Sequence, residues 1–252
     1  VPGAKGDTRY QRIAFVLMVA IFALLPLVAY PVFLMKVMCF ALFACAFNLL
    51  LGYTGQLSLG HVAFFGIGAY VTSLMSLGFE ITVWGDSKVG LDRQPVWLAM
   101  LTGIVAAGLC GWVIGKISFK VRGAYFVIVT VSFAEVVRLV ALNWIELTQG
   151  PMALNNIPYL KLEIPGLFEL SFLRKPSMYV LVMVVLVACY LMIRRLVNSR
   201  AGRAMIALRE NEPLATSVGV DVTRYLVLAT MISAAMAGAA SSIPTSSSSS
   251  TR

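Results

Sequence analysis

Long, uninterrupted apolar blocks constrain this sequence more than any other feature. Several of them run for about 20 residues, which is the length an α-helix needs to cross the hydrocarbon core of a membrane. Over the whole chain 60% of the residues are hydrophobic and 12% are charged, whereas a soluble domain usually carries about a quarter of its residues as charged ones. Because a backbone in lipid must satisfy its own polar groups, the sequence predicts an all-α, polytopic transmembrane helix bundle.

The apolar blocks predict about seven spans within one transmembrane domain, residues 1–240, whose N-terminus is cytoplasmic. The predicted spans are Ile13–Met35, Val37–Leu51, Leu59–Phe79, Val96–Ser118, Ala124–Leu142, Ser177–Val197 and Val222–Ala240. The stretch 37–79 either crosses the membrane twice or dips in and returns, because an odd number of crossings there would move the arginines of 194–209 outside.

The basic residues indicate this orientation. The net charge is +9, but the cations separate the apolar blocks instead of forming one surface, which argues against a nucleic-acid partner. Cytoplasmic loops of membrane proteins hold an excess of Lys and Arg. The predicted cytoplasmic set is Lys5, Arg9, Arg12, Lys116, Lys120, Arg122, Arg194, Arg195, Arg200, Arg203, Arg209 and Arg224, and the external set is Lys36, Lys88, Arg93, Lys161, Arg174 and Lys175.

The cysteines and the two chain ends carry further expectations. The four cysteines fall inside apolar blocks, so we expect no disulfide and no metal site. The first apolar block is too long for a signal peptide and is expected to stay as a span. The serine-rich tail, 241–252, is expected to be disordered or non-native, and we expect the natural chain to continue beyond it.

Glycines and polar side chains interrupt the apolar run between Gly52 and His61. This pattern predicts a broken helix, whose free backbone groups suit a zwitterionic substrate. The alternative is a tight cytoplasmic turn between two ordinary spans. His61 is the only histidine, and a hydrogen-bonded structural role is favoured over a proton relay or a metal ligand. The candidate substrate-pathway residues here are Gly52, Thr54, Gly55, Gln56, Ser58, Gly60 and His61.

Glu135 and Arg138 lie within one predicted span. A lone charge at the bilayer centre costs about 3 kcal/mol, and a spacing of three on a helix lets the two side chains pair. We expect both to face the bundle interior and to line the substrate pathway. Alternatively, Arg138 snorkels to the external interface and Glu135 is paired but without function.

The segment 199–220 is expected to be cytoplasmic. Ser199 can cap a short helix with Ala201, Ala204, Met205 and Leu208 on its apolar face. Pro213 then starts a second short helix. An apolar face this short needs a partner. The alternative is a basic linker resting on anionic lipid headgroups.

These residues resemble the Liv-type permeases of branched-chain amino-acid ABC importers, and their M-type member most. The resemblance rests on four segments, Phe47–Tyr70, Arg122–Phe126, Phe133–Arg138 and Ser199–Glu210. It implies a permease subunit in the bacterial plasma (inner) membrane that moves branched-chain or similar small amino acids by alternating access. It also implies that the subunit catalyses no covalent reaction.

The resemblance further implies partners for this chain. Segment 199–220 would be the coupling segment that docks into cytoplasmic ATP-binding subunits, which bind the ATP, so this chain needs no cofactor. A second permease subunit, membrane lipid and an external substrate-binding protein facing 143–176 complete the list. The implied coupling residues are Ala201, Gly202, Arg203, Ala204, Met205, Leu208, Arg209, Glu210 and Pro213.

The sequence leaves three alternatives to an amino-acid ABC permease. Gln149 and Ala153 stand where family members often have glycine, so the substrate is open, and urea or short amides fit as well. An ion-coupled secondary transporter would use Glu135 and the broken helix without any ATPase. A membrane enzyme is disfavoured, because the chain has one histidine and neither an HExxH nor a GxSxG pattern.

Overall fold

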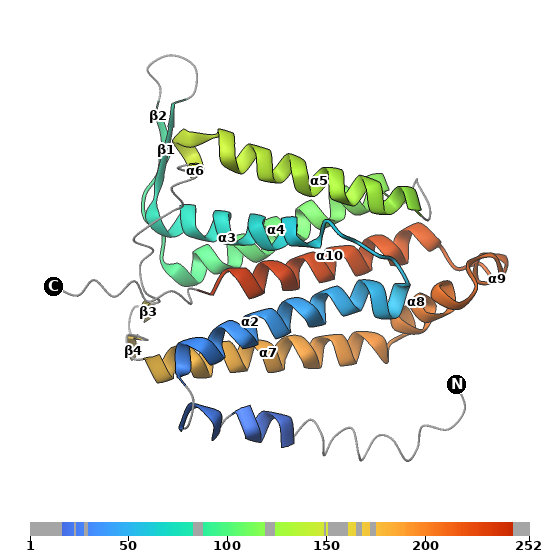
Figure 1. The fold of residues 1–252 in the computed structure, drawn as a ribbon, viewed down its shortest axis with the longest axis horizontal. Helices are drawn as coiled ribbons and strands as arrows, with labels where there is room; N and C mark the ends of the chain where they lie inside the picture. Colours follow the sequence, from blue (N-terminus) through green and yellow to red (C-terminus); the bar gives the residue numbers. More distant parts are fainter. Residues whose placement is uncertain are drawn as a thin grey trace.

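The structure, a computed structural model, is a bundle of helices that run along one common axis in both directions, with two short β-hairpins at one end (Figure 1). It describes residues 17–22, 24–27, 30–82, 88–118, 124–148, 150, 161–164, 168–171 and 175–243. The predicted all-α transmembrane bundle is confirmed, since the strands occur only in the two hairpins of the described residues.

Within the described residues, five helical segments are long and apolar enough to span a membrane. They are α2 (Pro31–Asn48) with its continuation η2 (Leu49–Thr54), α4 (Val96–Ser118), α5 (Ala124–Asn143), α7 (Lys175–Val197) and α10 (Val222–Ser241). A shorter apolar helix, α3 (His61–Leu77), joins them, and helical residues 17–22 precede the short turn η1 (Leu25–Leu27). The predicted spans from residue 96 onward agree with these helices to within two residues at each end.

The predicted boundary at Lys36 between the first two spans is wrong. α2 begins at Pro31 and runs past Lys36 without a break. Proline favours the first turn of a helix, because its φ is fixed and it has no N–H to leave unpaired. Lys36 is exposed and lies in the second turn of α2, close enough to the helix end for its side chain to reach the membrane interface.

The predicted interruption between residues 52 and 61 is present, and it is a turn between two helices that run in opposite directions, as the tight-turn alternative predicts. α2 ends in the π-helix η2, Gly55 stops it with a positive φ of 71°, and residues 56–60 are not helical before α3 begins. α3 then returns toward the end from which α2 came (Figure 1). A Cβ on Gly60 would lie 2.1 Å from the carbonyl oxygen of Thr130 in α5, so α3 begins against another helix inside the bundle.

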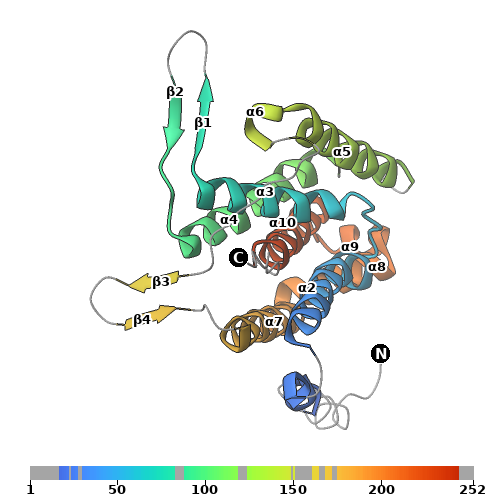
Figure 2. The same ribbon diagram turned by 60° about the vertical axis from the view of Figure 1, so that its left-hand side comes forward.

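Small residues let α3, α4 and α10 pack with their backbones nearly touching. A Cβ on Gly68 of α3 would lie 2.5 Å from the Cα of Gly238 in α10, and one on Gly111 of α4 would lie 2.4 Å from the Cβ of Ala234. Such contacts drive helix association in lipid, where the hydrophobic effect does not act between helices. These three helices therefore form the centre, and α2 pairs with α7 beside them (Figure 2).

The two ends of the bundle differ in structure and in charge. Helices α8 (Arg200–Glu210) and α9 (Glu212–Ser217) lie at one end. The opposite end carries α6 (Ile145–Thr148) and two hairpins, β1 (Phe79–Thr82) with β2 (Lys88–Leu91) and β3 (Lys161–Ile164) with β4 (Phe168–Ser171) (Figures 1 and 2).

The described basic residues sort between these ends as the sequence predicts. Lys116, Arg194, Arg195, Arg200, Arg203, Arg209 and Arg224 belong to the α8–α9 end, and Lys88, Arg93, Lys161 and Lys175 to the hairpin end. Lys5, Arg9, Arg12, Lys120, Arg122, Arg174, Gln149, Ala153 and the tail beyond Ile243 lie outside the described residues. That the α8–α9 end is cytoplasmic stays a prediction.

The close packing of α3 on α10 predicts a sharp difference between two glycines of α3. Gly68→Ala should destabilise the bundle by about 1–3 kcal/mol, because the added methyl group overpacks a backbone contact. Gly66→Ala is the control, since a Cβ there meets nothing within 4 Å. Thermal unfolding in detergent measures both variants, and equal midpoints would contradict this packing.

Candidate functional site

The predicted pair of short helices at 199–220 is present, and each begins at a side-chain cap. The hydroxyl of Ser199 accepts a hydrogen bond from the Gly202 N–H at 3.4 Å, and Asn211 Oδ1 accepts one from the Leu214 N–H at 3.0 Å. Gly202 permits the tight turn out of α7, because a Cβ there would lie 2.2 Å from the Val197 carbonyl oxygen. The segment is a compact two-helix unit and not an extended linker.

The apolar face of α8 packs against this chain's own bundle. Met205 and Leu208 are only 1% and 6% exposed, while Ala201 and Ala204 are half-buried. The expectation that this face waits for a partner is therefore wrong for Met205 and Leu208, because helices of the same chain already cover them. Sequence reasoning missed the apolar side chains that do stay exposed, Leu214 and Val218, which lie one turn apart at α9.

Four of the predicted coupling residues are accessible at the surface of this chain. Arg203, Arg209, Glu210 and Pro213 are all exposed. Arg203 donates a hydrogen bond to the carbonyl oxygen of Asn198 at 3.1 Å and so stays within its own segment. The surface that this unit offers to another protein is thus made of its charged residues and the apolar pair of α9.

Arg209 joins α8 to the broken end of α2. Its guanidinium Nη1 donates a hydrogen bond to the carbonyl oxygen of Gly52 in η2. A Cβ on Gly55 would lie 3.0 Å from the Arg209 Cγ, so the glycine also gives this side chain room. The last carbonyls of a helix lack partners within it, and here another element supplies one. The two predicted residue groups, the broken helix and the coupling segment, are therefore in direct contact.

Three other predicted pathway residues, Thr54, Gln56 and Ser58, lie within the break. Thr54 is buried and its hydroxyl donates to the Leu50 carbonyl oxygen at 2.6 Å, which also accepts the Gln56 N–H at 3.3 Å. Ser58 is buried and Gln56 half-buried. π-helical turns occur frequently at functional sites, and the loop that follows this one connects it to α3.

His61, the first residue of α3, is buried between helices. Its Nε2 lies 3.2 Å from the Ser233 hydroxyl of α10, and that hydroxyl donates to the Ala46 carbonyl oxygen of α2. The hydroxyl hydrogen is thereby used, so the imidazole must donate from Nε2 to the hydroxyl oxygen. This arrangement supports the structural role and ties together three helices.

Aromatic rings surround the His61 imidazole. The ring centroids of Phe43, Phe47 and Phe64 lie 5.5, 5.8 and 5.7 Å from it. Nδ1 has no hydrogen-bond partner within the described part of the chain. The surroundings supply neither a carboxylate for a proton relay nor a second metal ligand in the contacts that the structure gives to this ring.

The predicted pair of Glu135 and Arg138 forms, with Nη2–Oε1 and Nε–Oε2 distances of 2.6 and 3.0 Å. The expectation that both side chains face the bundle interior is wrong, because they are 52% and 60% exposed. The tight packing of α3, α4 and α10 fills the centre and leaves α5 at the outside of the bundle (Figure 2). The pair sits in the second half of α5, and Arg138 is as near to a helix end as Lys36 is in α2, so the alternative that Arg138 snorkels to the external interface stays a prediction.

A comparison with known proteins decides the family. Residues 31–250 match the family described as "Branched-chain amino acid transport system / permease component". This chain belongs to that family. The match includes both the helix break and the two-helix unit, and with the apolar helices it makes the chain a multi-pass membrane protein of the permease class.

Individual relatives agree with this assignment. The high-affinity branched-chain amino acid transport system permease protein LivM of Salmonella typhimurium is 31% identical over 82% of this permease chain and 50% of the relative. LivM of Escherichia coli K12 is 30% identical over 96% and 59%. The permease protein LivH of Salmonella typhimurium is 24% identical over 80% and 64%.

Two further findings concern the coverage of the relatives and the solved structures. This permease chain spans 50% and 59% of the length of the two LivM relatives. No solved structure matches it. The resemblance to the Liv-type permeases, M-type included, is confirmed at the level of the family.

The His61 contacts predict a measurable cost for removing the Ser233 hydroxyl. Ser233→Ala leaves a buried imidazole N–H unpaired, which should lower the free energy of unfolding by about 1–3 kcal/mol. Ser241→Ala on the same helix is the control, because its hydroxyl donates within that helix, to Gly238. Thermal unfolding of the purified permease tests this, and an unchanged midpoint for Ser233→Ala would count against the three-helix tie.

Proposed function

We propose that this chain is a transmembrane permease subunit of an ATP-driven importer for branched-chain or similar small amino acids. The contact of α8 with η2 carries the proposal, because it joins the segment expected to meet the ATPases to the segment expected to form the substrate pathway. Family membership and the printed names of the relatives support the transport class and the type of substrate.

Alternating access gives the contact its role. ATP binding closes the partner ATPases against the two-helix unit and shifts α8 relative to the bundle. Because Arg209 holds the Gly52 carbonyl and packs over Gly55, the shift reaches the non-helical residues 56–60 and then α3. Gly55, at φ 71°, is a backbone position that tolerates such a change more readily than a residue with a side chain.

The two-helix unit provides the docking surface for the ATP-binding subunits. Leu214 is 62% exposed and Val218 78% exposed, so these side chains offer the apolar contact. Arg203 and Glu210 beside them are exposed as well. Met205 and Leu208 act as anchors that hold α8 to the bundle, so a push on α9 moves the whole unit.

The exposed ion pair of α5 supports a second permease subunit on this side of the bundle. Charged side chains within a span face protein or a water-filled cavity and not lipid, and Glu135 with Arg138 is exposed in this single chain. A second subunit beside α5 places the pair in the pathway between subunits. There the carboxylate and guanidinium are suited to the ammonium and carboxylate groups of an amino acid.

The remaining partners and the cellular location follow from the orientation. With the α8–α9 end in the cytoplasm, the hairpin end faces an external substrate-binding protein at the bacterial inner membrane (Figure 1). Uptake then begins at the hairpins, passes between the permease subunits and ends beside the helix break. This subunit binds no ATP itself.

Reconstitution separates an ATP-driven importer from an ion-coupled carrier. Proteoliposomes holding this permease, its partner permease and the ATPases should take up leucine only with the binding protein outside and ATP inside. Urea and acetamide serve as competing substrates. Uptake by the permease alone, driven by a proton or sodium gradient, would contradict the proposal.

Arg209→Ala should uncouple ATP hydrolysis from transport. Loss of a hydrogen bond from a charged group costs about 1.5–3 kcal/mol, so leucine uptake should fall by about tenfold or more while the ATPase rate of the complex persists. Arg195→Ala removes an exposed arginine of α7 outside the two-helix unit and is the control, and Arg209→Lys should recover part of the uptake. A parallel loss of ATPase and uptake, or no loss of either, would refute the transmission role of Arg209.

A further inference from the structure

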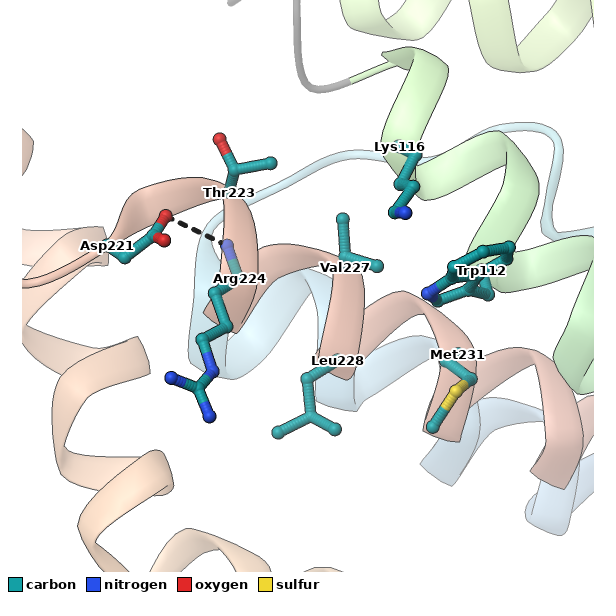
Figure 3. Close-up of a pocket in the computed structure, with 8 residues that line it drawn as sticks. All are labelled: Trp112, Lys116, Asp221, Thr223, Arg224, Val227, Leu228 and Met231. Atoms are coloured by element: carbon teal, nitrogen blue, oxygen red, sulfur yellow. Dashed lines mark hydrogen bonds between the residues drawn. The ribbon is translucent and has the colours of Figure 1, made fainter.

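An open groove of about 530 Å³ lies between α4 and α10 near the α8–α9 end of the bundle. Figure 3 shows side chains from both helices around it. It is separate from the helix break and from the α5 ion pair. Its lining is Trp112 and Lys116 from α4, Asp221 at the cap of α10, and Thr223, Arg224, Val227, Leu228 and Met231 from α10.

The charged residues of the groove gather at one end. Lys116 is in the last turn of α4 and Arg224 in the first turn of α10. Lys116 Nζ lies 4.1 Å from the centre of the Trp112 ring, a cation–π contact that leaves its N–H groups free for an anion. Neither cation has an acidic side chain within ion-pair distance in the described part of the chain.

Asp221 is the acidic residue of the lining, and it has a structural task. Its Oδ1 accepts a hydrogen bond from the backbone N–H of Arg224 at 3.1 Å and caps α10. With Lys116 and Arg224 the lining therefore carries a net positive charge.

The rest of the groove is apolar and points into the membrane-spanning part of the helices. On α4, Lys116 lies one turn closer to the α8–α9 end than Trp112. On α10, Arg224 lies one turn closer to that end than Leu228. Figure 3 shows Arg224, Leu228 and Met231 in a row along one face of α10. At 1.5 Å per residue this row is about 10 Å long.

We propose that the groove binds one anionic phospholipid of the cytoplasmic leaflet. Its phosphate sits beside Arg224, with Lys116 adding positive charge from the opposite wall of the groove, and an acyl chain lies along Leu228 and Met231 (Figure 3). Basic pockets between transmembrane helices on the cytoplasmic side are suited to anionic headgroups. A soluble phosphate would use only the polar end, whereas a lipid also covers the apolar half.

The test is lipid retention by the whole permease complex in a non-ionic detergent, measured by native mass spectrometry. Phosphatidylglycerol is the probe, phosphatidylethanolamine is the zwitterionic comparison, and glycerol 3-phosphate tests a free phosphate. Each cation near an anionic headgroup is worth about 1 kcal/mol, so each removal should weaken phosphatidylglycerol retention about fivefold. Lys116→Gln with Arg224→Gln should remove selective retention.

Matched variants make the result decisive. Arg194→Gln with Arg195→Gln removes the same charge from the same end of the bundle, on α7, and should leave retention unchanged. Leu228→Trp keeps both cations, fills the apolar half and should also abolish retention, while Lys116→Arg with Arg224→Lys should preserve it. Thermal unfolding verifies that each variant is folded, and Leu228→Trp decides the matter if the glutamine pair does not fold.

Several outcomes would overturn the proposal. Equal retention of phosphatidylethanolamine would remove the role of the cations. Displacement of the lipid by glycerol 3-phosphate alone would assign the site to a soluble anion. Equal losses in the α7 control, or full retention in Leu228→Trp, would place the lipid elsewhere, and a groove covered by a second permease subunit or an ATPase would retain no lipid at all.

Discussion

A helix that ends leaves backbone C=O groups without partners in that helix, and in this chain α2 ends where it meets α8. The interruption at residues 55–60 is possible because other elements supply the partners. The Arg209 guanidinium of α8 donates a hydrogen bond to the Gly52 carbonyl oxygen, and the Thr54 hydroxyl donates one to the Leu50 carbonyl oxygen. The break and the two-helix unit are thus in direct contact, and we propose that this contact transmits movement.

Close packing at the centre decides what lies at the periphery. Glycines bring α3, α4 and α10 together until their backbones nearly touch, and no room is left there for larger groups. α5 therefore lies outside, and its ion pair is exposed in the single subunit. The same packing leaves the amphipathic groove between the ends of α4 and α10 open on one side. We propose that both features are surfaces for other molecules, the ion pair for a second subunit and the groove for a lipid.

Much of the fold could be predicted because lipid imposes a simple length rule. The helices from Val96 onward follow apolar blocks whose limits are marked by charges. The Lys36 boundary was wrong because a lysine side chain can reach the interface from within a span, while Pro31 dictates the start of α2. At the site, Gly55 marks the helix break, and Ser199 and Asn211 cap the two short helices. These features could be predicted because each depends on residues that are close in the sequence.

The sequence by itself determined the class of fold, the helix break, the pairing of Glu135 with Arg138 and the two short helices, because each depends on residues that are near in the chain. Only the tertiary structure decided that Arg209 meets Gly52, that Met205 is covered, and that the ion pair faces outward. Those outcomes depend on which helix faces touch. In lipid that choice is made by backbone fit between distant segments, and apolar patterns do not encode it.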